Sequence, residues 1–537
     1  MRAAVDRPKR GLAHEPAAKG APLPPVRVQV RAFRCAPLSM LAIAAPLDEH
    51  GFDVVIVDAH VDPRWRESLR SQAEGAICAG ITALTGYQLR QGLEGARILR
   101  ASNRLLVLVW GGYQPSMYPE QALEDPLVDC VVTGLGEEPL LEICTRLAEG
   151  SSDLSGIPGV ALRLPDGRVQ CNDRRGMVDI NLFPRYPWHL VDLERYVEHD
   201  FTERSLSYNS SMGCPFNCAF CGVISALPRG WSGYTGERVT EEVEYLVRRH
   251  SLDGIAMMDN NYFVDRTRAR RISEMFLQRG LAIQWLAMGR ARDFISMGGD
   301  QLALFKRSGL KCVFIGAESG SDRMLKMIHK EQTVAEVVRC TEILTAYGVT
   351  PHYSFTLGYP PEPEGDIEAS LALVRRLKRI NPEAQMHLGY YAPYHGTPLY
   401  RWALRHGFEE PERFGEWSRL TLDSGRAPWI TASIRARVGR SDLILRTAFP
   451  HEDWLKRQIS ITAPVRATLR RLALRRWGSG STFVNDLRVL HRMNAVITNA
   501  MRIGKSVARK LRTRSMLPGS VPLVTAAVRR NAQRRHT

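Results

Sequence analysis

The chain lacks the features that would place it in a membrane or outside the cell. It has no run of about 18 apolar residues, so we expect no transmembrane helix. Residues 1–25 are rich in Ala, Pro, Arg and Lys but lack the apolar core of a signal peptide, and we expect a disordered leader there. The sequence therefore favours a cytoplasmic protein.

Cysteine is also scarce, with 10 in 537 residues, and seven of these are scattered singly, mostly in apolar runs. This spacing argues against a disulfide framework and favours small buried residues. The other three, Cys214, Cys218 and Cys221, lie in one short run. No fourth cysteine or histidine follows at the spacing of a structural zinc site, since the next histidine is His250. A disulfide within the triplet is the remaining alternative.

Acidic residues are nearly absent from residues 454–537, which contain 19 Lys or Arg and one acid, Asp486. This tail carries a charge of +18 against +17 for the whole chain, so everything upstream is close to neutral. A tail of this kind can bind an anionic membrane, nucleic acid or neither. Leucines lie among paired arginines in residues 466–477, which suits either an amphipathic helix on a membrane surface or a helix packed on the body.

Apolar runs alternate with helical patterns in residues 26–150. We expect strands at 26–32, 52–57, 75–81, 105–110 and 128–132, with helices at 37–49, 87–101 and 137–148. This order predicts a Rossmann-like, doubly wound parallel sheet that binds ligands at the carboxyl ends of its strands. Prolines and a short hairpin pattern in residues 151–205 indicate a connector.

A second alternation fills residues 206–408. We expect strands at 206–209, 254–258, 283–288, 312–315, 352–357 and 386–391, with helices at 237–249, 266–279, 334–347 and 366–380. Six such units predict a partial (β/α)6 barrel of the TIM type, and the cysteine run follows its first strand. Residues 409–537 are predicted to form a helical C-terminal region ending in the basic tail.

Three thiolates can hold three irons of a cubane 4Fe–4S cluster and leave the fourth iron open for chemistry. The C-x3-C-x2-C spacing, with Phe220 before the last cysteine, resembles that of the radical S-adenosylmethionine (SAM) enzymes. The resemblance implies that the open iron binds SAM and that one electron cleaves it to a 5′-deoxyadenosyl radical. It also implies an electron donor such as flavodoxin or ferredoxin. No cysteine follows Cys340, so we expect a single cluster.

Polar residues at later strand ends resemble the SAM-binding positions of that family. They are Asp259 and Asn260 after the second barrel strand, Arg290 after the third, and Gly316, Glu318 and Ser319 after the fourth. The resemblance implies that Asp259 binds the methionine ammonium, Arg290 its carboxylate, and Glu318 the ribose hydroxyls or the ammonium.

The N-terminal domain resembles cobalamin-binding Rossmann-like domains at three strand ends. The matching residues are Thr82 and Leu84 after the third strand, Gly111 and Gly112 after the fourth, and the later turn containing Gly134, Gly136 and Glu137. The D-x-H-x-x-G motif that ligates cobalt is absent, since residues 35–40 contain no histidine. We reject His60, which follows the second strand, and expect cobalamin without a protein histidine on cobalt. Cys35 is a weaker candidate for that position.

Residues 26–408 as a whole resemble the cobalamin-dependent radical SAM enzymes. The resemblance implies methylation of an unactivated carbon in a small-molecule or lipid-like substrate, with one SAM methylating cobalamin and another giving the radical. Radical cyclisation or rearrangement without methyl transfer is one alternative. An RNA-binding or RNA-modifying protein acting through the tail is another. A tRNA methylthiotransferase would need further N-terminal cluster cysteines, so nucleic acid is disfavoured.

Overall fold

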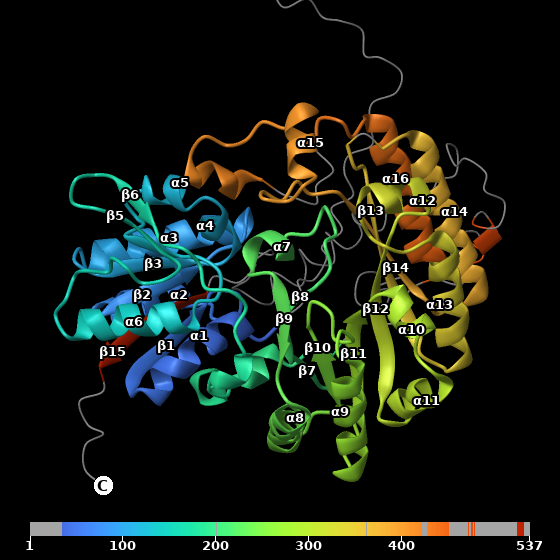
Figure 1. Ribbon diagram of the computed structural model, residues 1–537, viewed down its shortest axis with the longest axis horizontal. Helices are drawn as coiled ribbons and strands as arrows, with labels where there is room; N and C mark the ends of the chain where they lie inside the picture. Colours follow the sequence, from blue (N-terminus) through green and yellow to red (C-terminus); the bar gives the residue numbers. More distant parts are fainter. Residues whose placement is uncertain are drawn as a thin grey trace, which may run out of the picture.

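The computed structural model describes residues 35–199, 201–360, 362–420 and 427–449. It further describes residues 471, 474, 475 and 477, and the backbone of 524–530. The predicted leader, the predicted strand at 26–32 and most of the basic tail lie outside these residues. Two α/β lobes are seen side by side, with the cysteine run between them (Figure 1).

The N-terminal lobe is built on a seven-stranded sheet with the order β1-β15-β2-β3-β4-β5-β6. The strands are β1 Phe52–Asp58, β2 Cys78–Thr82, β3 Val107–Gly111, β4 Cys130–Val132, β5 Val160–Arg163, β6 Val169–Cys171 and β15 Val524–Arg530. Strands β2, β3 and β4 are parallel, and β15 pairs antiparallel with both β1 and β2. The Rossmann-like α/β architecture is confirmed.

Helices cover both faces of this sheet, which explains why its central strands are buried throughout. They are α1 Leu38–Glu49, α2 Trp65–Ala73, α3 Tyr87–Ser102, α4 Tyr113–Met117, α5 Pro119–Leu123 and α6 Glu137–Ala148. Helices α1 and α6 pack on one face with Met40, Leu47 and Ile143, and α2 and α3 pack on the other with Trp65 and Leu93. The cores on the two faces thus fix the sheet and, with it, the carboxyl ends of its strands.

Strand β15 is a departure from the predicted helical C-terminal region. Residues 524–530 come from the basic tail, yet they form a strand between β1 and β2 of the N-terminal sheet, where Val528 pairs with Cys78 and Val54. Val524, Thr525 and Val528 are β-branched, which suits a strand. The hairpin of β5 and β6, predicted within the connector, likewise extends the sheet beyond β4.

The second lobe contains the six predicted barrel strands, all parallel, in the order β14-β13-β12-β11-β10-β7. Their bounds are β7 Ser205–Tyr208, β10 Gly254–Met257, β11 Gln284–Gly289, β12 Leu310–Glu318, β13 Thr350–Leu357 and β14 Gln385–Tyr390. The helices are α8 Gly236–His250, α9 Arg266–Gln278, α10 Ala291–Ile295, α11 Gly299–Arg307, α12 Asp322–Met327, α13 Val334–Ala346 and α14 Glu364–Ile380. The partial barrel is confirmed.

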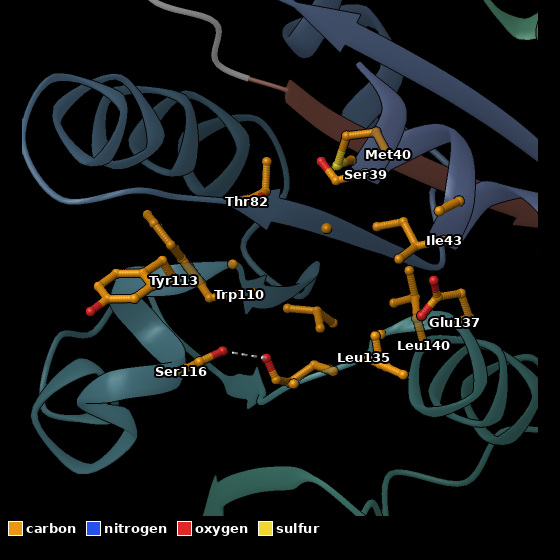
Figure 2. A pocket seen from close by; sticks show the side chains of 18 of the residues that line it. Ser39, Met40, Ile43, Thr82, Trp110, Tyr113, Ser116, Leu135, Glu137 and Leu140 are labelled. Atoms are coloured by element: carbon orange, nitrogen blue, oxygen red, sulfur yellow. Dashed lines mark hydrogen bonds between the residues drawn. The ribbon is translucent and has the colours of Figure 1, made fainter. Parts of the chain in front are cut away.

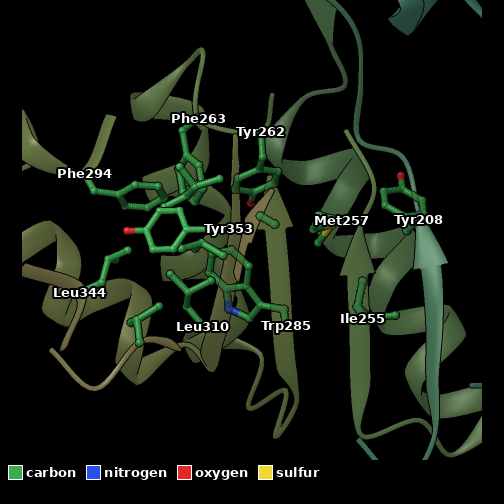
Figure 3. Packing of buried hydrophobic residues seen from close by; sticks show 14 of the residues in the cluster. Tyr208, Ile255, Met257, Tyr262, Phe263, Trp285, Phe294, Leu310, Leu344 and Tyr353 are labelled. Carbon is green, nitrogen blue, oxygen red and sulfur yellow. The ribbon is translucent and has the colours of Figure 1, made fainter. Parts of the chain in front are cut away.

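Aromatic side chains fill the space between these strands and their outer helices (Figure 3). Trp285 on β11 is fully buried and contacts Tyr262 and Phe305. Its indole Nε1 donates a hydrogen bond to the Ser308 carbonyl at 3.0 Å, so the ring is buried without leaving a donor unpaired. This core fixes the strands whose ends form the rim of the barrel.

Shorter elements lie between or beside the two lobes, and the long helix α16 Ala432–Ala448 packs against β14. The shorter ones are β8 Ser211–Cys214, β9 Gly230–Gly233, α7 Val223–Ala226, η1 Ile180–Leu182, η2 Trp188–Leu190, η3 Leu193–Tyr196, α15 Tyr400–Arg405 and η4 Phe414–Arg419. Tyr113 in α4 donates to the His395 carbonyl at 3.0 Å, and Trp417 Nε1 donates to Gln121 Oε1 at 2.8 Å. Among the described residues, no helix has the length and apolar character needed to cross a bilayer.

Candidate functional site

The cysteine run forms a loop between β8 and α7, at the carboxyl end of the first barrel strand. Cys214 ends β8, and Cys218 and Cys221 lie in the turn that follows, where the Cys221 amide donates to the Cys218 carbonyl at 3.0 Å. All three thiols are free and partly exposed. The loop is tied to the barrel at both sides, because Ala219 N donates to Ile328 O at 2.8 Å and Ala219 O accepts from Leu399 N at 3.0 Å.

The three thiols fit a cubane cluster better than a single metal ion. Within the described part of the chain, no group of three His, Cys, Asp or Glu side chains converges as ligands of one ion would. A cubane needs no such convergence, because each thiolate binds a different iron. Burial raises the pKa of each thiol, and the cations Arg290 and Lys330 oppose this at Cys214 and Cys218. The net pKa shift of all three thiols is upward, so a bound metal centre, and not the loop alone, would hold these sulfurs as thiolates.

Lys330 belongs to a segment, residues 328–332, that the sequence analysis missed. The segment links the cysteine loop to two strand ends, since Ile328 O accepts from Ala219 N, Lys330 O accepts from Arg290, and Gln332 Nε2 donates to Gly316 O at 2.9 Å. The Lys330 ammonium forms an ion pair with Glu318 at 2.9 Å, with both side chains more than nine-tenths buried. No spacing rule connects residue 330 to a strand end, so only the fold could reveal it.

Asp259 lies at the predicted strand end but has internal partners. It accepts hydrogen bonds from the hydroxyls of Ser210, at 2.7 Å, and Ser211. Burial raises its pKa, and the nearby Arg268 guanidinium and the two serines oppose the rise. Asp259 thus anchors the start of β8, and its role toward the methionine ammonium stays a prediction. Asn260 beside it is exposed.

The other predicted rim residues occupy different environments. Arg290 is buried, stacks its guanidinium 3.7 Å above the centroid of the Phe216 ring in the cysteine loop, and has no partner on Nε. Glu318 closes β12 with a left-handed φ of 60°. Ser319 is fully buried and points to α14, where its hydroxyl lies 3.2 Å from that of Ser370. Arg290 and Glu318 flank the cysteine loop, whereas Asn260 is exposed and Ser319 contacts α14.

Glu362, beyond the end of β13, is a further buried carboxylate that sequence reasoning overlooked. One oxygen accepts from the amides of Gly358 and Tyr359, at 2.5 Å and 3.2 Å, and the other has no partner. Burial raises the pKa of Glu362 to about 7. A glutamate directly after paired prolines was the available signal.

A cavity of about 240 Å³ opens at the strand ends of the N-terminal sheet, and we call it the strand-end pocket. Six of the seven residues predicted to seat cobalamin line it: Thr82, Gly111, Gly112, Gly134, Gly136 and Glu137. Leu84 does not line it and is 53% exposed. Met212, Ala226 and Leu227, from beside the cysteine loop, line the same pocket. The two lobes therefore share one cavity.

The structure explains why residue 112, the second of the paired glycines, is a glycine. Gly112 has a φ of 86°, and a Cβ there would lie 2.6 Å from Thr82 Oγ1 and 2.9 Å from the Ala83 amide. The ends of β2 and β3 approach closely at this point, because Ala83 N donates to Gly111 O at 3.0 Å. Glycine is thus needed both for the backbone conformation and for the close approach.

Glu137 gives the strand-end pocket a polar group. Figure 2 shows its carboxylate pointing from the start of α6 into the space between α1 and the strand ends. Its Oε2 is buried without a hydrogen-bond partner, and burial raises its pKa. An orphaned buried oxygen in an otherwise largely apolar cavity fits a ligand with hydrogen-bonding groups, such as part of cobalamin.

No histidine is among the described residues that line this pocket. The nearby start of α1 contributes Ser39, Met40 and Ile43 instead (Figure 2). His60 lies outside the lining, as does Cys35, whose pKa burial raises to about 11. Cobalamin without a protein histidine on cobalt stays a prediction.

Comparison with known families gives two matches along the chain. Residues 24–144 match the B12 binding domain, and residues 208–374 match the Radical SAM superfamily. The chain is 29% identical over 328 residues to an uncharacterized methyltransferase of Pyrococcus horikoshii, covering 60% of this chain and 69% of that protein. It is 26% identical over 333 residues to the anaerobic magnesium-protoporphyrin IX monomethyl ester cyclase of Rubrivivax gelatinosus, covering 60% of this chain and 59% of the cyclase.

The fold is also similar to a solved structure. The radical SAM methyltransferase TsrM from Kitasatospora setae, with cobalamin and a [4Fe-4S] cluster bound, superposes with a TM-score of 0.60 at 17% identity. The similarity covers 82% of this chain and 97% of TsrM. Both lobes therefore share the arrangement of that fold.

Proposed function

We propose that this chain, which belongs to the radical SAM enzymes that carry a cobalamin-binding domain, methylates an unactivated carbon of a small-molecule or lipid-like substrate. Its cofactors are a 4Fe–4S cluster, SAM and cobalamin. One observation supports this most directly. Ala226 and Leu227 line the strand-end pocket only five and six residues after Cys221, so one short loop serves both cofactor sites. Methyl transfer requires cobalt and the radical to reach the same substrate carbon.

When bound, the cluster and SAM supply a radical that removes hydrogen from carbon, and cobalamin supplies the methyl group. The chain's part is to hold and orient these groups. Cys214, Cys218 and Cys221 would hold the cluster, Arg290 and Glu318 would orient SAM, and Thr82, Gly112 and Glu137 would seat cobalamin. Tyr113 packs edge-on against Tyr394 and donates a hydrogen bond to the His395 carbonyl, so the two lobes are in direct contact beside the strand-end pocket.

The test is anaerobic reconstitution with iron, sulfide and hydroxocobalamin, followed by dithionite and SAM. We expect bound cobalamin and release of 5′-deoxyadenosine, measured by mass spectrometry. Cys218→Ala should abolish release, and Cys171→Ala, which changes an exposed cysteine outside the loop, should not. Release that survives Cys218→Ala would contradict the assignment of the loop.

A radical cyclisation or rearrangement without methyl transfer is the second candidate, since a cyclase is among the relatives. The product mass decides between them. A gain of one methyl group, carrying label from methyl-labelled SAM, supports methyl transfer. Loss of hydrogen without label supports cyclisation.

We further propose that a flavodoxin or ferredoxin supplies the electron and that the basic tail makes a peripheral contact with anionic membrane. The charge of residues 454–537 supports the second proposal, and it suits delivery of a lipid-like substrate. The full-length protein should sediment with anionic liposomes at low salt and remain in solution with neutral ones. Equal sedimentation with both would contradict an electrostatic contact.

A further inference from the structure

We infer that Lys330 and Glu318 form a charge-balanced pair beside the cluster, in which each charge offsets the effect of the other on the reduction potential of the cluster. Their ion pair of 2.9 Å is buried at the rim of the barrel, beside the cysteine loop. Neither residue contacts the strand-end pocket. The inference depends on the cluster and goes beyond the proposed methyl transfer.

The backbone places this pair against the cysteine loop. Ala219, between Cys218 and Cys221, is hydrogen-bonded to Ile328, two residues before Lys330. The Lys330 ammonium lies 5.9 Å from the ring centroid of Phe220, which directly precedes Cys221. Lys330 is thus a buried cation held close to the sulfur ligands, in surroundings with little water to screen it.

The backbone at Glu318 and on both sides of Lys330 has an unusual conformation. Only four described residues other than glycine have a positive φ, and three of them are Glu318, His329 and Glu331. Such residues are disfavoured in proteins and gather where function requires a fixed geometry. Strain on both sides of Lys330 and at Glu318 itself indicates that the position of the pair is maintained despite this cost.

Gly316 provides the room for the pair. A Cβ at this position would overlap the Glu318 carboxylate and lie 2.5 Å from Lys330 Nζ. Its φ is not left-handed, so the backbone alone does not require glycine there. The absence of a side chain at residue 316 is explained by the space that the two charges occupy.

The charges around Lys330 favour its ammonium form. Burial favours the neutral amine, but the Glu318 carboxylate and the Cys218 sulfur together raise the pKa of the ammonium. Glu318 is further held by Thr356, whose hydroxyl donates to Oε2 at 3.1 Å. Arg290 is the other buried cation at the loop, and its guanidinium is fixed on Lys330 O and Phe216.

The consequence for the cluster follows from its charge. A cluster held by three thiolates gains one further negative charge on reduction, so a nearby cation favours the reduced state and a nearby anion disfavours it. With both charges present, the two effects largely oppose each other. Removing one partner exposes the effect of the other, and the sign of the change identifies which charge remains.

The experiment is a redox titration of the reconstituted full-length protein, without SAM or substrate, followed by the electron paramagnetic resonance signal of the reduced cluster. Lys330→Met should lower the midpoint potential, because it leaves the Glu318 carboxylate alone. Glu318→Gln should raise it. The double variant should return close to the wild-type value, and Lys330→Arg should stay there.

Shifts of Lys330→Met and Glu318→Gln in the same direction, or no shift in either with iron and sulfide content intact, would overturn the proposal. If Lys330→Met fails to retain a cluster, Glu318→Gln and the double variant still decide, since the double variant buries no charge. Gly316→Ala gives an independent check, because its Cβ displaces the pair without changing the charge. A potential identical to wild type in Gly316→Ala and in both single variants would refute the role of the pair and leave methyl transfer untouched.

Discussion

Replacing Gly112 by alanine should weaken cobalamin binding as well as destabilise the fold. Gly112 has a φ of 86° and a ψ of −172°, a conformation that is essentially restricted to glycine, and an alanine there costs roughly 1–3 kcal/mol. The new Cβ would also lie 2.6 Å from Thr82 Oγ1, 2.9 Å from Ala83 N and 3.0 Å from Ala83 O. Overpacking of this kind costs about 1–3 kcal/mol. The Ala83 atoms belong to the backbone, so the ends of β2 and β3 must move apart.

That movement would act on the strand-end pocket directly. Thr82 and Gly111 line it, and Ala83 is hydrogen-bonded both to Gly111 and to Gln114, at 3.0 Å each. If the shift removes 1.4 kcal/mol or more of binding free energy, affinity falls at least about tenfold. Titration of the apoprotein with hydroxocobalamin, followed by absorption spectroscopy, measures this loss.

Gly51 provides the matched control. It lies in the same lobe with a φ of 78°, but a Cβ there would meet nothing within 4 Å. Gly51→Ala should therefore lose only about 1–2 kcal/mol of unfolding free energy and bind cobalamin as wild type does. If Gly112→Ala bound cobalamin as tightly as Gly51→Ala, the close approach of β2 and β3 would not shape the site.

Three further changes test the barrel and the joint between the lobes. Because burial raises the pKa of Glu362 from its ordinary 4.5 to about 7, this carboxyl stabilises the folded chain fully below pH 4.5 and loses that contribution as the pH rises through 7. Glu362→Gln should remove roughly 3 kcal/mol of pH dependence over this range, visible in urea unfolding at several pH values. Tyr196→Phe removes the 2.9 Å hydrogen bond to buried Asp58 and should cost about 1–3 kcal/mol, whereas no change would show that water replaces the hydroxyl. Trp285→Ala should cost about 3–5 kcal/mol, measured by the same unfolding, because the indole is fully buried among aromatic rings. A smaller loss would indicate that Tyr262 and Phe305 collapse into the cavity.

The sequence predicted the parts of the fold that local patterns encode. Strands such as β3 and β13 were located to within about two residues, because continuous or alternating apolar runs bounded by glycine have few other interpretations. The cysteine spacing and the paired glycines at the end of β3 predicted the cofactors through their resemblance to known families. The domain boundaries at residues 150, 205 and 408 stay predictions.

What local patterns do not encode was missed. Val528 pairs with Cys78, and no rule of spacing connects two segments so far apart. The hydrogen bonds that Asp259 accepts from Ser210 and Ser211, which precede the cysteine loop, were also not predicted, and its role toward the cofactor stays a prediction. In the sequence, Lys330 lies between α12 and α13 and does not follow a strand. Its position beside the cysteine loop depends on how residues 328–332 cross the rim of the barrel.

The short helix α7 explains how one chain can serve two cofactors with little added machinery. Four residues long, it starts two residues after Cys221 and ends where Ala226 and Leu227 line the strand-end pocket. A Cβ on Gly222, just before α7, would lie 3.0 Å from Tyr113 Cε2, and Tyr113 itself lines that pocket. Any displacement of the cysteine loop is therefore transmitted to the strand-end pocket through direct contact. Because α7 is only four residues long and Gly222 lies against Tyr113, the cysteine loop and the lining of the strand-end pocket are joined by a short contact and not by a long linker.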